Sequence, residues 1–325
     1  MKEILTVFLR LGTFGFGGPV AMIGYMEEEC VHRRKWMSAH EFHKTVAVCK
    51  LFPGPLATLI AIRLGTHKAG RLGGALAATC LILPAFLMIL GLAQVTSITE
   101  SMPALVPLWA GLTVGALAIS FLAVVQLSKP LFLNRHLPML TLISLILINA
   151  VLTFYDPPHE ALYLIATGFL GIAFTWIKTK SRTFELFSGA VAFTLFYSCV
   201  KASFLTFGSG IAIVPVLKAV FVDEHHWISN DTFLKSLTLG QITPGPLVIL
   251  GTYLGYVILG FAGAVITTVG TFLPTFFLGL FVVPAVEKKL LQNETLQIFF
   301  HWLLILTQTY SYALIFFRPK IAISY

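Results

Sequence analysis

The chain has 325 residues, of which 57% are hydrophobic and 11% are charged, and its mean hydropathy is +0.87. This composition excludes a soluble globular domain and indicates an all-α polytopic membrane protein, because backbone groups in lipid must be satisfied within their own helix. The formal net charge of +8 does not indicate a nucleic-acid partner, since the basic residues are scattered through short connections.

The first half, predicted at residues 1–183, contains two interrupted apolar runs. The run at 4–23 is broken by Gly-Phe-Gly-Gly-Pro at 15–19, and the run at 45–64 is cut near its start by Pro53-Gly54-Pro55. Glycine and proline at these places predict broken helices. The other segments of this half are a polar connection at 27–44, apolar spans at 72–93, 105–127, 137–154 and 161–177, and a basic stretch at 178–182.

The second half, predicted at residues 184–325, contains the same kinds of segment in the same order. Because nothing after residue 317 matches the spans at 137–177, we expect the second repeat to be shortened at its C-terminus. Its segments are an apolar run at 184–205, a glycine break at 207–210, a polar connection, a second Pro-Gly-Pro at 244–246, and apolar spans at 259–283 and 299–317.

An internal duplication organises the whole chain. The Pro-Gly-Pro at residues 53–55 returns 191 residues later at 244–246, and beyond the prolines the offset becomes 190. Agreement at a fixed offset over long stretches indicates two homologous halves. The matched residues include Phe16 and Phe207, Trp36 and Trp227, and Ser38 and Ser229 at the first offset, then Gly70 and Gly260, and Pro84 and Pro274 at the second.

The basic residues of the two polar connections suggest a topology. Residues 27–44 contain four lysines and arginines, whereas residues 218–235 contain two and add three acidic residues. Because basic loops favour the cytoplasm, we expect the copies to face opposite sides as inverted repeats, with 27–44 and 178–182 inside and the N-terminus outside.

The four breaks are candidate anion sites. Backbone amides at a helix start carry partial positive charge, and glycine lets an anion approach them closely. The alternative is that these glycines serve close helix packing and the prolines serve kinks, but duplication at matched places favours the functional interpretation. The candidate residues at the breaks are Gly17, Gly18, Pro53, Gly54, Gly208, Ser209, Pro244 and Gly245.

Basic residues inside apolar runs are the second group of candidates. Arg10 and Lys201 are equivalent at the offset of 191, and each precedes its glycine break. A charge in lipid is costly, so such residues are functional candidates, although snorkelling to the interface is an alternative. Lys50 corresponds to Gln241, which can also donate to an oxyanion, while Arg63 has no basic counterpart and could be a simple topology signal.

The remaining reactive side chains do not predict a metal, a cofactor, a disulfide or an enzyme. The four cysteines lack metal-ligand spacing, and most histidines of the polar connections are expected to be solvated. No catalytic nucleophile with a nearby base is apparent in the spans. A proton-coupled mechanism would need a carboxylate at a span end, such as Glu29 or Asp223, for which an ordinary solvated charge is the favoured interpretation.

Several motifs together resemble the two-domain form of the chromate ion transporter family, over residues 7–283. The resemblance implies a multi-pass bacterial inner-membrane protein with two halves of opposite orientation that exports chromate and confers chromate resistance, with sulfate competing. The alternatives are a transporter of sulfate or another oxyanion, and a shortened inactive homologue that acts only as a scaffold. The motifs are residues 14–19, 33–36, 52–56, 206–210 and 243–246, with Trp227.

The mechanism expected from these features is alternating access around a midplane site. A tetrahedral dianion, chromate or sulfate, would be held there by side chains and by backbone amides at the breaks. Proton-driven efflux, sulfate exchange and uniport remain open, and membrane lipid and a second copy of the chain are the other partners considered. The groups assigned to the site are Arg10, Lys201, Gln241 and the amides near Gly17, Gly18, Gly208 and Ser209.

Overall fold

The computed structural model describes residues 1–99, 187–206 and 213–292, together with residues 111 and 115. Every regular element in these residues is a helix, which confirms the predicted helical class. Several predictions lie outside the described residues: the basic stretch at 178–182, the break residues Gly208 and Ser209, and the spans at 137–154, 161–177 and 299–317, with all but residues 111 and 115 of the span at 105–127.

The first interrupted run forms a helical hairpin. Gly17 and Gly18 have φ values of +101° and +71°, in a region that favours glycine, and Pro19 lies in the first turn of the helix that follows. The second arm returns alongside the first, since Arg10 contacts Glu29 across the hairpin. The elements are α1 (Lys2–Phe14), α2 (Gly18–Glu27) and the short π-helix η1 (Glu28–Arg33).

The second interrupted run also turns at its break, because α3 (Ala39–Lys50) ends before Pro53 and α4 (Leu56–Thr99) begins after Pro55. Within α4 the backbone leaves helical geometry at Ala69 and Gly70, and the chain folds back on itself. A Cβ at Gly65 would lie 2.3 Å from the carbonyl oxygen of Gly73, although residues eight apart in a straight helix are about 12 Å apart.

The second half repeats this plan. In α11 the backbone leaves helical geometry at Leu259 and Gly260, and a Cβ at Gly255 would lie 2.2 Å from the carbonyl oxygen of Gly263. The turns in α4 and α11 agree with the predicted starts of the spans at 72–93 and 259–283. The elements are α8 (Phe187–Phe204), α9 (Ile213–Lys218), η5 (Ala219–Glu224), α10 (Asn230–Ile242), η6 (Leu247–Ile249), α11 (Leu250–Phe277), η7 (Leu278–Val282) and α12 (Val283–Gln292).

Backbone details recur at the offsets found in the sequence. The φ values of Gly54 and Gly245 are +107° and +106°, and Lys35 and His226 both have a φ of +50°. The Ser38 hydroxyl accepts a hydrogen bond from the Glu41 amide at the start of α3, and the Ser229 hydroxyl accepts one from the Thr232 amide at the start of α10. The two halves therefore share local conformation as well as sequence.

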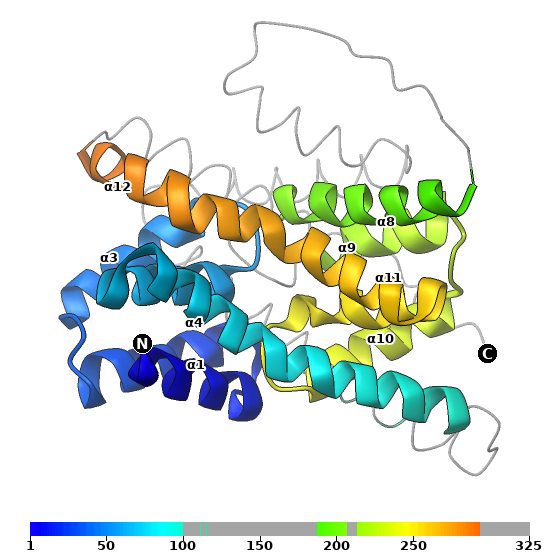
Figure 1. The fold of residues 1–325 in the computed structure, drawn as a ribbon, viewed down its shortest axis with the longest axis horizontal. Helices are drawn as coiled ribbons and strands as arrows, with labels where there is room; N and C mark the ends of the chain where they lie inside the picture. Colours follow the sequence, from blue (N-terminus) through cyan, green and yellow to red (C-terminus); the bar gives the residue numbers. More distant parts are fainter. Residues whose placement is uncertain (100–110, 112–114, 116–186, 207–212, 293–325) are drawn as a thin grey trace, which may run out of the picture.

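The long second segments of α4 and α11 run antiparallel beside each other (Figure 1). The Arg71 guanidinium lies 5.1 Å from the centre of the ring of Phe281 in η7, which continues α11, and the Phe86 and Phe261 rings are 6.5 Å apart. The two glycine turns therefore lie at opposite ends of the pair. After its turn, α4 continues for about 43 Å, which exceeds the roughly 30 Å of a bilayer's hydrocarbon core.

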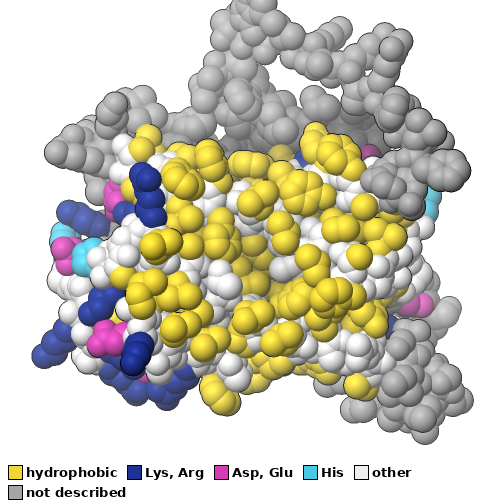
Figure 2. Space-filling model, viewed as in Figure 1, with side chains coloured by type: hydrophobic (Ala, Val, Ile, Leu, Met, Phe, Trp, Pro, Cys, Tyr) yellow, Lys and Arg dark blue, Asp and Glu magenta, His cyan; other side chains and the backbone are white. Residues whose placement is uncertain are grey.

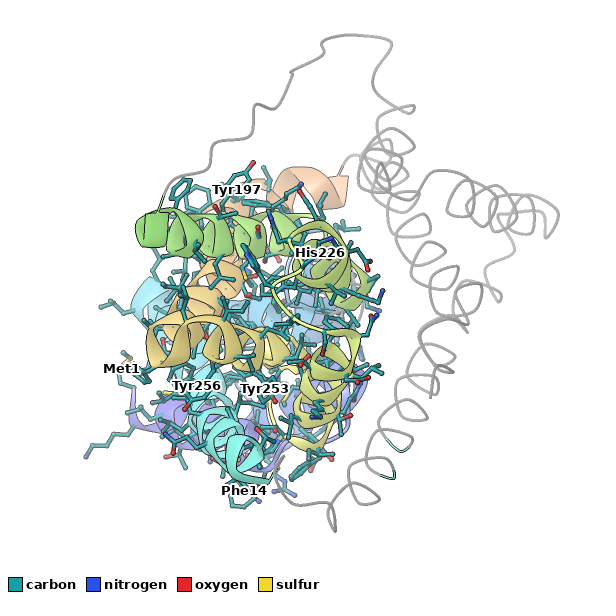
Figure 3. The ribbon with its side chains drawn as sticks, turned by 90° about the vertical axis from the view of Figure 1, so that its right-hand side faces the viewer. Met1, Phe14, Tyr197, His226, Tyr253 and Tyr256 are labelled. Carbon is teal, nitrogen blue, oxygen red and sulfur yellow. The ribbon has the colours of Figure 1, made fainter. Side chains whose placement is uncertain are left out.

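The surface also suits a bilayer. Two apolar helical runs of 41 residues, Leu56–Thr96 and Leu247–Glu287, are long and apolar enough to cross a membrane. Figure 2 shows hydrophobic side chains across the middle of one face, while charged and histidine side chains gather at the end that carries α1 and α3. Figure 3 looks onto the opposite end, where α8, α10 and α11 lie together and Tyr253 and Tyr256 mark α11. A broad exposed apolar face of this kind is expected where lipid replaces water.

Candidate functional site

Backbone groups at the helix breaks of one half form hydrogen bonds with backbone groups at the breaks of the other half. The Gly54 amide donates a hydrogen bond to the Thr206 carbonyl over 2.6 Å, and the Gly245 amide donates to the Gly15 carbonyl over 3.0 Å. These two bonds join equivalent residues, because 54 and 245, like 15 and 206, are separated by 191. Reciprocal contacts of this type are the property of an interface with two-fold symmetry. The tips of the hairpins therefore meet around a local pseudo-two-fold axis.

Close packing at these tips requires glycine. A Cβ at Gly54 would lie 2.3 Å from Thr275 Oγ1, and a Cβ at Gly245 would lie 2.8 Å from the Cβ of Ala85. Ala85 and Thr275 are themselves equivalent at the offset of 190. The two halves differ in chemistry here, since Thr275 and Ser203 carry hydroxyls where their equivalents Ala85 and Gly12 have none, and the buried Thr275 Oγ1 and Ser203 Oγ lack hydrogen-bond partners within the described residues.

Three helix starts converge where the tips meet. Gly18 at the start of α2, Pro55 before α4 and Gly245 before η6 line one small cavity. Partial positive charge at helix starts makes this the type of place predicted for an anion. The cavity volume is about 10 Å³, room for at most one water molecule, so the centre is closed in this conformation.

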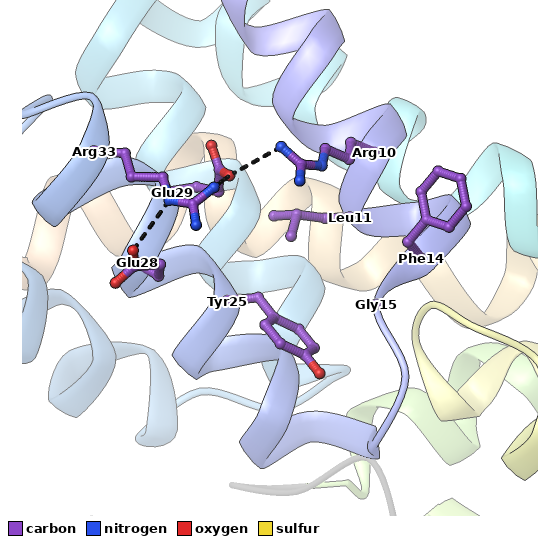
Figure 4. A pocket seen from close by; sticks show the side chains of 8 residues that line it. All are labelled: Arg10, Leu11, Phe14, Gly15, Tyr25, Glu28, Glu29 and Arg33. Carbon is purple, nitrogen blue, oxygen red and sulfur yellow. Dashed lines mark hydrogen bonds and ion pairs between the residues drawn. The ribbon is translucent and has the colours of Figure 1, made fainter.

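A larger pocket of about 290 Å³ opens beside the tip of the first hairpin (Figure 4). It lies between α1, α2 and η1 and contains Arg10 near Gly15. The Arg10 side chain is 61% exposed, so this cation is solvated within the pocket and is not buried among apolar groups. The complete lining is Arg10, Leu11, Phe14, Gly15, Tyr25, Glu28, Glu29 and Arg33.

Glu29 binds three arginines at the edge of this pocket. Its carboxylate oxygens lie 3.4 Å from Arg10 Nη1, 3.1 Å from Arg33 Nη1 and 3.4 Å from Arg34 Nε, and only 11% of its side chain is exposed. Arg33 also donates to Glu28 over 3.0 Å, and this bond together with the charge of Glu29 raises the pKa of the Arg33 guanidinium. The cluster of three arginines and two glutamates carries a net charge of +1.

The π-helical winding of η1 explains this cluster. A π-helix brings residues five apart together, and the Arg34 amide donates to the Glu29 carbonyl over 3.0 Å. The same spacing pairs the side chain of Arg33 with Glu28 and that of Arg34 with Glu29. Glu29 was expected to be a solvated charge, but it is largely buried, because Arg34, five residues on, and Arg10 of α1 join the ordinary i,i+4 pair with Arg33.

The other predicted residues lie in different settings. Arg63, on the first segment of α4, is hydrogen-bonded to Glu287 on α12, and its Nε is buried without a partner in the part of the chain that the structure describes. Lys201 is exposed on α8. Lys50 and Gln241 are half-buried at equivalent places near the ends of α3 and α10. The remaining break residues are Gly17, which is exposed, Pro53, which is half-buried, and Pro244, which is buried.

Comparison with known proteins identifies the family. A family model described as chromate transporter matches residues 2–172 and 193–316, which cover both halves. The chain belongs to the chromate transporter family. The predicted resemblance is therefore confirmed, and membership in a transporter family makes the chain a membrane protein.

Curated relatives agree with this assignment. The chain is 30% identical to the chromate transport protein of Cupriavidus metallidurans over 305 residues, covering 89% of this chain and 75% of the relative. It is 30% identical to the chromate transport protein of Pseudomonas aeruginosa over 317 residues (91% and 76%), and 29% identical to the probable chromate transport protein of Synechococcus elongatus over 308 residues (89% and 77%). No solved structure matches the chain.

Proposed function

We propose that this protein exports chromate across the bacterial inner membrane as a multi-pass secondary transporter. The observation that carries the proposal is the meeting of helix starts from both halves beside a pocket that contains Arg10. The names of the relatives supply chromate as the anion, and the geometry supplies a place suited to a tetrahedral dianion.

The Arg10 pocket is the solvent-exposed part of the proposed path. Its volume of about 290 Å³ exceeds that of a tetrahedral oxyanion several times over, so a partly hydrated anion fits. Charge-assisted hydrogen bonds from guanidinium groups to oxyanions are among the strongest in proteins. An anion that reaches Arg10 and Arg33 is then next to Gly15, whose carbonyl anchors the tip of the opposite half.

The closed cavity between the tips is the buried part of the proposed path. It lies at the starts of α2 and α4, where amides of the glycine breaks can replace water around the anion. Opening this cavity requires the hairpin tips to separate, and the reciprocal bonds from Gly54 and Gly245 are the contacts that would break and reform. Lys201, Gln241, Lys50 and the break residues Gly17, Gly208 and Ser209 are proposed to complete the site in other conformations.

We propose that the two halves are inverted repeats that rock about the tips. The antiparallel second segments of α4 and α11, with their glycine turns at opposite ends, support this orientation. A pseudo-two-fold axis in the membrane plane would place the tips near the bilayer midplane, where inverted-repeat transporters hold their substrates. Sulfate has the same charge and shape as chromate, and we expect it to compete for the same site.

Expression in chromate-sensitive cells tests the direction of transport. Export predicts lower intracellular chromium and growth at higher chromate, and Arg10→Gln should abolish both effects. Lys2→Gln, an exposed lysine on the same helix, is the matched control and should behave as wild type. Higher intracellular chromium in expressing cells would indicate uptake, and no effect with protein present in the membrane would favour sulfate transport or an inactive scaffold.

A further inference from the structure

We propose that Glu29 is a proton-binding site that competes with the transported anion for the arginines of the pocket. Without the anion, the ionised carboxylate of Glu29 holds Arg10, Arg33 and Arg34. When a dianion enters the pocket, Glu29 takes a proton from water and the arginines turn to the anion. This inference rests on the proposed function, because it assigns the coupling of the same site.

The contacts support such an exchange. Glu29 occupies the wall of the pocket, and two of its three arginines, Arg10 and Arg33, line the same pocket. The distances of 3.1–3.4 Å are hydrogen-bonding distances to guanidinium groups, so a dianion that takes over these N–H donors displaces the Glu29 carboxylate. The exposure of Arg10 leaves its guanidinium free to turn from one acceptor to the other.

The charges of the cluster favour the protonated form once the anion is bound. With both glutamates ionised the cluster carries a charge of +1, so one negative charge of a bound dianion is not neutralised. Protonation of Glu29 raises the cluster to +2 and matches the charge of chromate or sulfate. Because each ligand makes the other bind more tightly, proton and anion binding are reciprocally coupled.

Glu29 is distinguished from its titratable neighbours by the number of arginines that it holds. Glu28 is half-exposed and contacts Arg33, whereas Glu27 bonds to His43 on α3 over 3.2 Å. Protonation of either would therefore release one basic side chain at most. The charged and titratable groups around the cluster are Arg10 on α1, Tyr25 and Glu27 on α2, His43 on α3, Glu28, Cys30, His32, Arg33 and Arg34 in η1 and the residue after it, and Lys68 on α4, which pairs with Glu3.

The second half does not repeat this cluster. At the offset of 191, Glu29 corresponds to Val220 and Arg33 to Glu224, although Arg10 keeps a basic equivalent in Lys201. The duplication would otherwise supply two proton sites. We therefore expect a single proton to move with each anion.

The first test measures proton uptake on anion binding to the purified full-length protein. Isothermal titration with chromate, and separately with sulfate, in buffers of different ionisation enthalpy gives the number of protons bound. We expect about one proton per anion near neutral pH, and an anion affinity that rises up to about tenfold for each pH unit of acidification. Zero proton uptake by a wild-type protein that binds sulfate, which stays a dianion near neutral pH, overturns the proposal.

The second test assigns that proton to Glu29. In Glu29→Gln the anion affinity should no longer change with pH. Chromate flux in proteoliposomes should then proceed without proton movement. Glu27→Gln, at a residue outside the pocket lining that bonds to His43, is the matched control and should keep both. If Glu29→Gln does not insert stably, Glu29→Asp keeps the charge with a shorter reach and should retain proton uptake at altered affinity. Coupling unchanged in Glu29→Gln contradicts the inference, whereas absence of saturable anion flux in wild type contradicts the proposed function instead.

Discussion

Replacing Gly54 by alanine should both destabilise the protein and lower transport. Two separate costs apply, because Gly54 has a φ of +107° and its Cβ would lie 2.3 Å from Thr275 Oγ1. Positive φ in a residue with a side chain costs about 1–3 kcal/mol, and overpacking of a buried contact costs about 1–3 kcal/mol more. The expected loss of unfolding free energy is therefore about 2–6 kcal/mol, with displacement of the bond from the Gly54 amide to Thr206.

Two other glycines separate these costs. Gly70 has a φ of +67° but open space where its Cβ would be, so Gly70→Ala should show only the backbone cost of about 1–3 kcal/mol. Gly24 lies inside α2 with open space and no positive φ, so Gly24→Ala should be neutral or stabilise by up to about 1 kcal/mol. Thermal unfolding in detergent and chromate flux are measured for all three variants. Equal stability of Gly54→Ala and Gly70→Ala would refute the close packing of the tip.

Three further predictions concern residues away from the pocket. Arg63→Met or Glu287→Met alone should cost about 3–5 kcal/mol by leaving a charge unpaired, whereas the double variant should recover most of the stability and keep chromate flux; loss of flux in a stable double variant would make Arg63 a substrate ligand. Hydrogen bonds from the backbone amide and then the hydroxyl of Ser38 lower the pKa of Glu41 below its ordinary 4.5, so their stabilisation is present above that value and lost as pH falls through the folded pKa. Glu41→Gln, which removes the titrating carboxyl, should make thermal stability less sensitive to acid between about pH 5 and about pH 3, and an unchanged pH dependence would contradict this. Gly65→Leu should separate the two segments of α4 and cost at least about 1–3 kcal/mol, measured by thermal unfolding, because its Cβ would meet the facing backbone.

The sequence predicted the breaks and turns because their geometry restricts the residue type. Gly54 and Gly245 need positive φ, and proline beside them ends each helix, so these features can be recognised without a structure. The duplication helped further, since a glycine at the same place in both halves indicates a shared structural requirement. The spans at 72–93 and 259–283 were predicted from apolar composition, and their starts lie at the turns within α4 and α11.

The contacts between distant segments could not be predicted in this way. Arg63 and Glu287 are separated by 224 residues, and no periodic pattern links them. The bond from Gly54 to Thr206 depends on how the hairpins pack, which local propensity does not encode. Of the arginines around Glu29, Arg33 lies at the usual four-residue spacing, whereas Arg34 requires the five-residue spacing of a π-helix and Arg10 comes from another helix.

The central claim is that the cationic pocket beside the hairpin tips lies on a path for chromate. Its most direct test is the flux of radiolabelled chromate in proteoliposomes that contain wild type, Arg10→Gln or Lys2→Gln at equal density. We predict saturable flux that sulfate inhibits, a loss of about 10–100-fold in Arg10→Gln from the missing charge-assisted hydrogen bonds, and wild-type flux in Lys2→Gln. Undiminished flux in Arg10→Gln, or no flux from well-folded wild-type protein, would contradict the account.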